Sequence, residues 1–503
     1  MKSRKYITTA IDYPNAAPHM GHVLEKVIAD AGARWFRLKG MEVRFQIGTD
    51  EHGVKVQRTA EAQGLTPSQL VNKNVPLFED LYRKLNISFD KFVRTTDKKA
   101  HWPTVIELWK RLDKAGKLGK RSYKGLYCSG CEKFVTQRDL EGGKCVNHNK
   151  EPEEVSEENW FFSLGEDAQN LKNLLTSDWG GERYRIMPDF RENETLSLIG
   201  QGLEDVSFSR PRSSLDWGIP VPGDEGQTMY VWCDALANYI SGLGFFTAKE
   251  EREWWDSAEV IHVIGKDIAR FHALIWPAML KNAGVRIPDK LLIHGFLTSE
   301  GEKMSKSIGN VVVPGDVLKK FAQDPDPLRF YLLHEVPLGR DGDFSWERIM
   351  SLYDSKLRND IGNLLNRVVV LINKAGGNLG SIEKNDNIAD CWEKFEKSMD
   401  NFEFSEALKC PLEIANEANK RINDREVWKM KGDAKIDELS FLAECLRHIA
   451  LMLLPFAPSA SARMFKQLGL EIPEVLEGKT GWGEEKGWKK VGKAEILFMK
   501  HET

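Results

Sequence analysis

The chain carries two short basic segments that are far apart in the sequence. The first is His19-Met20-Gly21-His22, and the second is Lys303-Met304-Ser305-Lys306-Ser307. Imidazole and ammonium groups donate hydrogen bonds to phosphate oxygens and stabilise the negative charge that develops as pyrophosphate leaves. If the fold brings both segments to one crevice, they predict a site that holds ATP while a carboxylate attacks its α-phosphate.

The His19 segment lies at the start of a predicted helix over residues 20–39, in which apolar side chains recur on one face and Gly40 provides the stop. The N-terminus of a helix offers free amide groups and a partial positive charge to phosphate. His19 and His22 share a face of the first turn, and Gly21 leaves room for a base or a ribose. The alternative is that both histidines only cap the helix, because so short a motif recurs by chance.

The Lys303 segment is predicted to be a loop, because Gly301 and Gly309 flank it and a buried strand over residues 290–294 precedes it. Lys303 and Lys306, together with two serines, concentrate donors for phosphate oxygens. The alternative is an ordinary solvated charged loop. The presence of both segments, in this order, favours the functional interpretation.

The elements around these segments predict a parallel sheet. Residues 6–11 and 42–47 have the pattern of buried strands on either side of the helix at 20–39. Such a βαβ unit places its binding crevice at the carboxyl ends of the strands, where both the His19 loop and Asp50 lie. The same alternation of helix and strand resumes over residues 230–294, with a helix expected over residues 268–280. After about residue 324 the patterns are helical, which predicts a bundle.

The segment between about residues 123 and 227 has a different pattern, which predicts an insertion with a small metal module. Cys128, Cys131, Cys145 and His148 form two pairs of the type C-x-x-C and C-x-x-H, separated by a 13-residue spacer. Three thiolates and one imidazole complete a tetrahedral zinc site with no open position, so one structural Zn²⁺ is expected. The alternative, four residues that bind no metal, is disfavoured by the paired spacing.

The bulk composition sets further limits. A chain of 503 residues with 41% hydrophobic and 29% charged residues is expected to form several domains. A net charge of −4 means that a nucleic acid must be bound through a local basic patch. Seven cysteines do not make a disulfide scaffold and suit a reducing compartment. With no apolar signal core and no run long enough to span a bilayer, the protein is expected to be cytoplasmic and without a membrane partner.

The two basic segments are similar to the signature motifs of class I aminoacyl-tRNA synthetases, and their surroundings resemble the methionyl-tRNA synthetase family. The resemblance runs from near residue 5 to about residue 460. It is carried by the stretches 8–15, 48–53, 230–235, 265–268 and 294–297, with the sequences TTAIDYPN, GTDEHG, YVWCDA, GKDI and HGFL.

The resemblance implies an α/β fold in which a doubly wound parallel-sheet (Rossmann-like) catalytic domain carries an inserted zinc-bearing domain and is followed by an all-α helical-bundle domain. The expected divisions are the first half of the catalytic domain (1–118), the inserted connective domain (119–227), the second half with the Lys303 loop (228–323), a linking segment that contacts the tRNA stem (324–355) and an anticodon-binding domain (356–503).

The implied activity is ATP-dependent conversion of L-methionine to methionyl-adenylate, followed by transfer of the methionyl group to tRNA(Met) with release of AMP and pyrophosphate. The implied catalytic residues are His19, His22, Lys303 and Lys306. ATP, with Mg²⁺ on its phosphates, is expected to contact these four residues and Pro18, Gly21, Gly265 and Asp267. The tRNA is expected to bind through its acceptor end and through its CAU anticodon, the latter at Asn363, Arg367 and Trp428. A monomer is expected.

The implied methionine pocket combines a carboxylate for the substrate ammonium with an apolar cavity for the thioether arm. Its members are Ile11, Tyr13, Asp50, Trp232, Ala235, Leu236, Tyr239, Ile268, Phe271 and His272. Aromatic rings suit a polarisable sulfur atom. Leu236 stands where the family often has proline. For Trp232, Tyr239 and Phe271 the alternative is ordinary core packing.

Other functions remain open on the sequence alone. A synthetase for leucine, isoleucine or valine would need a large editing insertion, for which residues 123–227 leave no room. A cysteine-specific relative uses zinc in its substrate pocket, whereas the Cys/His set here is closed. A non-catalytic RNA-binding protein with the same fold is disfavoured by the intact His19, His22, Asp50, Lys303 and Lys306. Amino-acid-dependent pyrophosphate exchange separates all of these.

Overall fold

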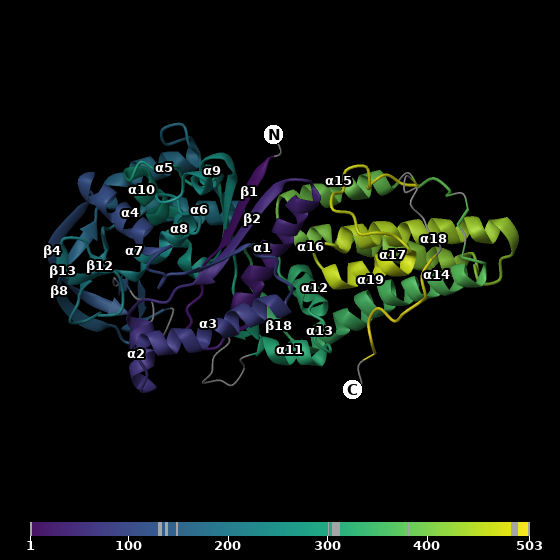
Figure 1. Cartoon of the computed structure of the whole chain (residues 1–503), viewed down its shortest axis with the longest axis horizontal. Helices are drawn as coiled ribbons and strands as arrows, with labels where there is room; N and C mark the ends of the chain where they lie inside the picture. The colour runs from purple at the N-terminus through teal and green to yellow at the C-terminus, as the bar shows by residue number, and fades with distance from the viewer. Residues whose placement is uncertain are drawn as a thin grey trace.

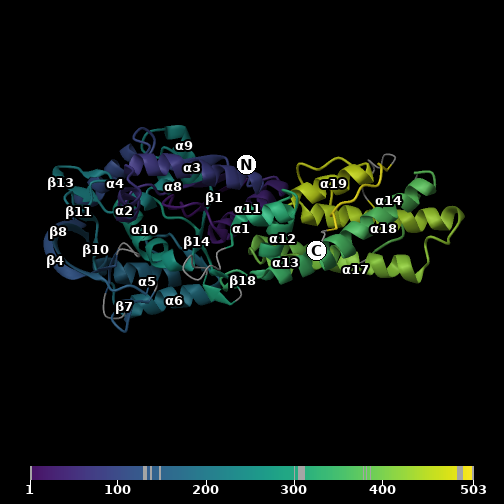
Figure 2. The same ribbon diagram turned by 90° about the horizontal axis from the view of Figure 1, so that it is seen from below.

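The computed structural model describes residues 3–128, 133–135, 139–146, 149–299, 301–303, 312–377, 379–380, 382–385, 387–483 and 491–500. The chain forms two lobes that lie end to end along its longest axis, an α/β lobe drawn from purple to teal and a helical lobe drawn from green to yellow (Figure 1). The same division is visible from below (Figure 2).

A six-stranded parallel sheet forms the centre of the α/β lobe. Its strands, in spatial order, are β3 (Lys91–Arg94), β2 (Glu42–Thr49), β1 (Arg4–Thr9), β14 (Glu259–Gly265), β15 (Lys290–His294) and β9 (Arg185–Met187). Because β1 pairs with β2 on one side and β14 on the other, the chain reverses its strand order here, and the crevice of such a sheet opens at this point. The predicted parallel-sheet core is confirmed.

Helix α1 (Met20–Leu38) follows β1 and is buried on most of its circumference. The sequence pattern indicated one apolar face, but α1 lies between the sheet and the helical lobe and contacts both. Three charged side chains are therefore enclosed with the apolar ones: Glu25, Lys26 and Asp30. Gly40, with φ of 75°, adopts the left-handed conformation that ends the helix turn.

The other helices of the α/β lobe cover the sheet and its crevice. They are α2 (Val54–Ala62), α3 (Pro67–Lys84), α4 (Trp102–Lys114), α5 (Ala168–Thr176), α6 (Asp189–Gly200), α7 (Val231–Leu236), α8 (Asn238–Ser241), α9 (Lys249–Ser257) and α10 (Trp276–Asn282).

The inserted segment forms two small antiparallel sheets and a hairpin. The first sheet has the strand order β10 (Val206–Ser207), β8 (Glu153–Phe162), β4 (Leu118–Cys128) and β5 (Lys133–Val135). The second sheet has the strand order β11 (Ser209–Pro211), β13 (Asp224–Met229) and β12 (Pro220–Val221). The hairpin pairs β6 (Leu140–Glu141) with β7 (Lys144–Cys145).

The expected inserted domain at 119–227 is not one continuous unit. Strand β9 comes from the middle of this segment, yet it pairs with β15 and forms an edge of the main sheet. Helix α6 packs beside β9. A strand of three residues gives little sequence signal, yet it covers the backbone groups that β15 would otherwise expose.

The helical lobe confirms the predicted helical C-terminal region. It comprises α11 (Pro314–Lys320), α12 (Asp326–Glu335), α13 (Trp346–Leu352), a π-helix (Tyr353–Gly362), α14 (Asn363–Lys374), α15 (Asn387–Asp400), α16 (Phe404–Ala407), α17 (Lys409–Asp424), α18 (Gly432–Leu453) and α19 (Pro458–Leu468). One short strand interrupts it: β18 (Gly342–Phe344) pairs with β16 (Leu297–Ser299). Across the described residues, no helix combines the length and apolarity needed to cross a bilayer.

A buried ion pair joins the two lobes. Arg329 on α12 places Nη2 2.7 Å from Oδ2 of Asp30 on α1, and both side chains are 0% exposed. Arg329 also donates to the carbonyls of Leu85, Pro455 and Phe456. Burial acts to raise the pKa of Asp30, but Arg329 and Arg34 outweigh it and bring that pKa down to about 2.

Candidate active site

His19 and His22 form the N-cap of α1. His19 Nδ1 accepts a hydrogen bond from the amide of Gly21 (3.2 Å), and His22 Nδ1 accepts one from the amide of His19 (3.1 Å). The two rings stack with centroids 3.8 Å apart. Because both Nδ1 atoms accept, the hydrogen bonds assign the proton of each neutral ring to Nε2, which becomes its donor. Capping and phosphate binding, which the sequence left as alternatives, are therefore compatible.

The surroundings of the histidine pair keep His22 uncharged. Burial and the positive charges of Lys26 and Lys55 hold the pKa of His22 well below its usual value. A Cβ at Gly21 would lie 3.1 Å from Cε1 of His19, so a side chain there would require the His19 ring to move by a few tenths of an ångström. The start of α1 thus presents backbone amides and neutral imidazole donors, a combination that suits phosphate.

Gly265 ends β14, the strand next to β1, and Asp267 lies in the 3₁₀ turn (Lys266–Ile268) that follows. A Cβ at Gly265 would approach Oδ1 of Asp267 to 2.8 Å and Cε1 of His294 to 3.6 Å. The absence of a side chain here keeps the backbone open beside two polar groups. Pro18 lies half-buried just before the histidine pair.

Lys303 belongs to β17 (Glu302–Lys303), whose backbone pairs with β16 so that Lys303 is opposite Thr298. Strand β16 follows β15 after a short connection, so the Lys303 segment begins near the strand end at His294. Lys306 lies outside the described residues. The role of both lysines stays a prediction from the sequence.

Four of the expected methionine-binding residues form a continuous aromatic and polar wall. Trp232 stacks on Phe271 with ring centroids 3.9 Å apart and an interplanar angle of 9°. The Tyr239 hydroxyl donates to Nε2 of His272 (2.6 Å), whose Nδ1–H donates to the Ile268 carbonyl (3.0 Å). Burial lowers the pKa of His272 to about 4, so the ring is neutral at physiological pH.

The backbone around this wall is not the regular helix expected over residues 268–280. A 3₁₀ turn, a π-helical turn (Phe271–Ile275) and α10 succeed one another. Turns of the π type are frequent at functional sites, and this one carries both Phe271 and His272. The sequence pattern missed it because apolar periodicity does not distinguish an α-turn from a π-turn.

Other expected pocket residues lie just after the ends of β1 and β2 and on α7. Asp50, at the end of β2, is buried and donates its backbone N–H to the Asp12 carbonyl (2.9 Å). Ile11 and Tyr13 are half-buried on either side of Asp12, and Ala235 and Leu236 are buried in α7.

Sequence reasoning missed a buried carboxylate between two histidines. Asp234 on α7 lies 2.6 Å from Nδ1 of His52 through one oxygen and 2.6 Å from Nε2 of His101 through the other. Burial acts to raise the pKa of Asp234, but the histidines outweigh it and hold that pKa at about 2. Asp234 thereby ties the loop that carries Asp50 to the helix that carries Trp232. An acidic residue inside the apolar run of α7 was the available signal.

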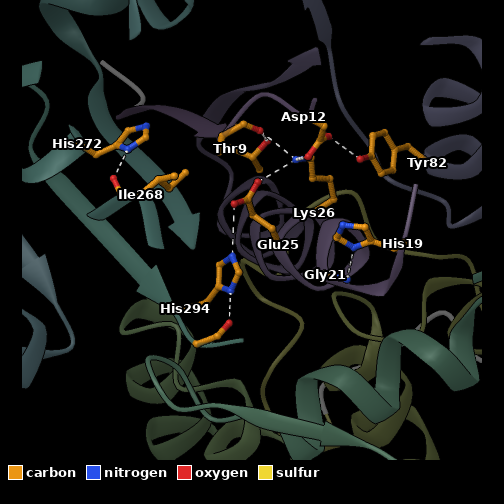
Figure 3. A network of polar contacts seen from close by, with 12 residues as sticks. Thr9, Asp12, His19, Gly21, Glu25, Lys26, Tyr82, Ile268, His272 and His294 are labelled. Atoms are coloured by element: carbon orange, nitrogen blue, oxygen red, sulfur yellow. Dashed lines mark hydrogen bonds and ion pairs between the residues drawn. The ribbon is translucent and has the colours of Figure 1, made fainter. Parts of the chain in front are cut away.

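A second missed cluster surrounds Lys26 on α1 (Figure 3). Lys26, on α1, is enclosed by Asp12, Glu25 and the carbonyl of Ala10, and Tyr82 donates to Asp12. Adjacent charged residues on a helix normally indicate a solvated face, so the sequence pattern gave no reason to expect them inside.

Two of the expected zinc ligands are described. Cys128 ends β4 and Cys145 ends β7, and both are buried in one small cluster with Val135. Cys131 and His148 lie outside the described residues. Within the described part of the chain, no group of three or more potential metal ligands is present.

The expected anticodon residues meet on the helical lobe. Arg367 on α14 has its guanidinium 5.8 Å from the ring centroid of Trp428 and donates through Nη2 to Oδ1 of Asn423 (2.9 Å). Trp428 is 44% exposed, so its ring is accessible from solvent. Asn363 is exposed one helical turn before Arg367.

A parallel sheet with a histidine-capped helix at its crevice, joined to a helical lobe with an exposed Arg–Trp pair, has the architecture of a class I tRNA synthetase. A family model described as "tRNA synthetases class I (M)" matches residues 5–148 and 135–369. A methionine–tRNA ligase of Caldanaerobacter subterraneus subsp. tengcongensis is 40% identical over 514 residues, which cover 99% of this chain and 79% of the relative.

Two further relatives agree. The chloroplastic/mitochondrial methionine–tRNA ligase of Arabidopsis thaliana is 37% identical over 99% of this chain and 83% of its own length. A structure of Mycobacterium tuberculosis methionyl-tRNA synthetase in complex with methionyl-adenylate is 35% identical, with a TM-score of 0.90 over 99% of this chain and 100% of that chain. The chain therefore belongs to the methionine–tRNA ligase family, and the family and enzyme class predicted from its motifs are confirmed.

Proposed function

We propose that this chain performs the reaction of its family, the ATP-dependent ligation of L-methionine to tRNA(Met), with the residues described above. The observation that carries the proposal is that the α/β lobe holds both the aromatic wall of Trp232 and Phe271, with the neutral Tyr239–His272 pair, and a helix N-terminus that suits phosphate. Aromatic rings suit the polarisable thioether arm of methionine, and the helix N-terminus suits the phosphates of ATP.

In the first step, a methionine carboxylate oxygen attacks the α-phosphorus, and the bond to the pyrophosphate oxygen breaks with its electron pair. Nε2–H groups of His19 and His22 and the ammonium groups of Lys303 and Lys306 stabilise the developing charge. Mg²⁺, when bound with ATP, neutralises phosphate oxygens. No enzyme nucleophile is required, because positioning and charge stabilisation provide the acceleration.

In the second step, a ribose hydroxyl of the terminal adenosine of the tRNA attacks the methionyl carbonyl, and AMP leaves. Asp50 holds the methionine ammonium in both steps, while Trp232, Phe271 and His272 hold the side chain. Ile11, Tyr13, Ala235, Leu236 and Ile268 complete the pocket. Pro18, Gly21, Gly265 and Asp267 line the adenosine side.

The helical lobe reads the anticodon in this proposal. Unpaired bases stack on exposed aromatic rings and accept hydrogen bonds from planar donors. Trp428 provides the ring, and Arg367 and Asn363 provide the donors. Residues 324–355 link the lobes and contact the tRNA stem, and residues 356–503 form the anticodon-binding domain.

One structural Zn²⁺ is proposed for the inserted segment, held by Cys128, Cys131, Cys145 and His148. The burial of Cys128 and Cys145 in one cluster, each at a strand end, fits two knuckles that close on a metal. Bound zinc would hold the β4–β5 turn and the β6–β7 hairpin together. We further propose that the enzyme is a cytoplasmic monomer, for which size-exclusion chromatography with light scattering tests the oligomeric state.

Pyrophosphate exchange, measured with each of the twenty amino acids, tests the function. Exchange should depend on methionine, with little exchange for leucine, isoleucine, valine or cysteine. Exchange with one of these in place of methionine would overturn the substrate assignment. No exchange with any amino acid would favour the non-catalytic RNA-binding alternative.

A further inference from the structure

Lys26 is a fully buried lysine whose three ammonium donors each have one acceptor. Nζ lies 2.9 Å from the Ala10 carbonyl, 2.7 Å from Oδ1 of Asp12 and 2.8 Å from Oε1 of Glu25. It lies one helical turn beyond His22 on α1, and Figure 3 shows it together with Asp12 and Glu25. An ammonium group has three donors, and this site uses all of them.

One arm of the cluster leads to the methionine side. The second oxygen of Asp12 accepts a hydrogen bond from the Tyr82 hydroxyl (2.6 Å), which fixes the carboxylate from its other end. The Asp12 carbonyl accepts the N–H of Asp50 (2.9 Å). Asp12 also stands between Ile11 and Tyr13 in the chain. The position of Asp12 therefore determines where the Asp50 backbone and the loop after β1 lie.

The other arm leads to the nucleotide side. Oε2 of Glu25 lies 3.3 Å from Nε2 of His294, and Nδ1–H of His294 donates to the Gly295 carbonyl (2.7 Å). His294 ends β15, approaches the open backbone at Gly265, and precedes β16 and β17, where Lys303 lies. Glu25 thus connects Lys26 to the strand end from which the lysine segment starts.

The charges make this connection depend on Lys26. Burial raises the pKa of Asp12 to about 6 even with the ammonium beside it. Burial also acts to raise the pKa of Glu25, but Lys26 and His294 outweigh it and lower that pKa. Without the ammonium, two buried carboxylates would face one cavity, and one of them would take up a proton or turn away.

We propose that Lys26 is a positioning residue that couples the methionine site to the ATP site, so that either substrate strengthens the binding of the other. The inference rests on the proposed function. When one substrate binds and fixes its arm of the cluster, it also fixes the shared ammonium of Lys26. The other arm then loses less conformational entropy when its own substrate binds. Such a coupling is reciprocal, and couplings between sites in proteins commonly lie between about 5- and 150-fold.

The test measures the methionine Kd by calorimetry, with and without a non-hydrolysable ATP analogue, in the full-length enzyme. The wild type should bind methionine about tenfold more tightly with the analogue present. Lys26→Met, which keeps the length of the side chain but removes the charge, should reduce this ratio to less than about threefold. The control Lys39→Met breaks an ion pair with Asp400 at the other end of α1 and should leave the ratio unchanged.

A second variant tests the proposal even if Lys26→Met folds poorly. Glu25→Gln keeps the Lys26–Asp12 ion pair and removes the carboxylate charge that faces both Lys26 and His294 on the other arm. It should lose the coupling ratio while its methionine Kd without the analogue stays within about threefold of the wild type.

A wild-type ratio of one, or full coupling in both variants, would overturn the proposal. Failure of the proposed function would differ, because the wild type would then show no methionine-dependent pyrophosphate exchange.

Discussion

Replacing Arg329 by methionine should destabilise the protein more than any comparable change on its surface. The substitution leaves Asp30 buried with Arg34 as its remaining cationic partner, and removes donors from the carbonyls of Leu85, Pro455 and Phe456. Removing one partner of a buried ion pair costs about 3–5 kcal/mol. A cost in this range is expected because Asp30 loses its fully buried partner and keeps only Arg34, whose side chain is 20% exposed.

Equilibrium unfolding in urea, followed by circular dichroism, measures this loss. Arg463→Met is the matched control: Arg463 pairs with Asp324 at 2.8 Å, but its side chain is 37% exposed. An ion pair of that kind contributes about 0–1 kcal/mol. If the free energies of unfolding of the two variants differ by less than about 1 kcal/mol, the reasoning is refuted, because burial would then not determine how much stability is lost.

The same ion pair predicts a pH dependence. The pKa of Asp30 falls from 3.8 to about 2, and a depressed carboxyl pKa stabilises the folded state at pH values above the unfolded pKa. The shift is worth about 2 kcal/mol, which should be lost as the pH falls from about 4 through about 2. Arg329→Met should lose this part of the acid dependence.

Arg329→Met should also affect pyrophosphate exchange and tRNA charging to different extents. In the proposed function, pyrophosphate exchange uses only the α/β lobe, whereas tRNA charging also needs the helical lobe in a fixed position. Charging should therefore fall more than exchange. Equal losses in both assays would indicate a general loss of folding instead of a loosened joint.

Four further substitutions test the proposed sites. Asp234→Ala should raise the methionine KM in pyrophosphate exchange by about tenfold and leave the ATP KM unchanged, because His52 and His101 lose their shared acceptor. Asp234→Asn should restore most of the loss. An equal rise in both KM values would argue for a general structural role. Trp428→Ala should weaken tRNA binding by about 1–3 kcal/mol in a filter-binding assay, with exchange unchanged. Lys306→Ala should lower adenylate formation by about 10²–10³-fold and spare the methionine Kd. Cys145→Ala should abolish the zinc that mass spectrometry would otherwise find at about one ion per chain.

The local features of this protein were readable from its sequence. The strands at both sides of α1, the bounds of that helix and the helical region after residue 324 follow from apolar periodicity and from helix-ending residues, which act within a few positions. The two basic segments and the stretches around Asp50 and Trp232 predicted the enzyme family for the same reason, because chemistry requires particular side chains at short spacings.

Only the tertiary structure decided which distant groups share one environment. Strand β9 joins the main sheet because an edge needed pairing, and the turn at Phe271 is π-helical where an ordinary helix was expected. Lys26 lies inside the protein because Asp12 and Glu25 meet it there, and Asp30 is charged because Arg329 arrives from the other lobe. Burial and pairing depend on atoms brought together by the whole fold, so neither can be read from neighbours in the sequence.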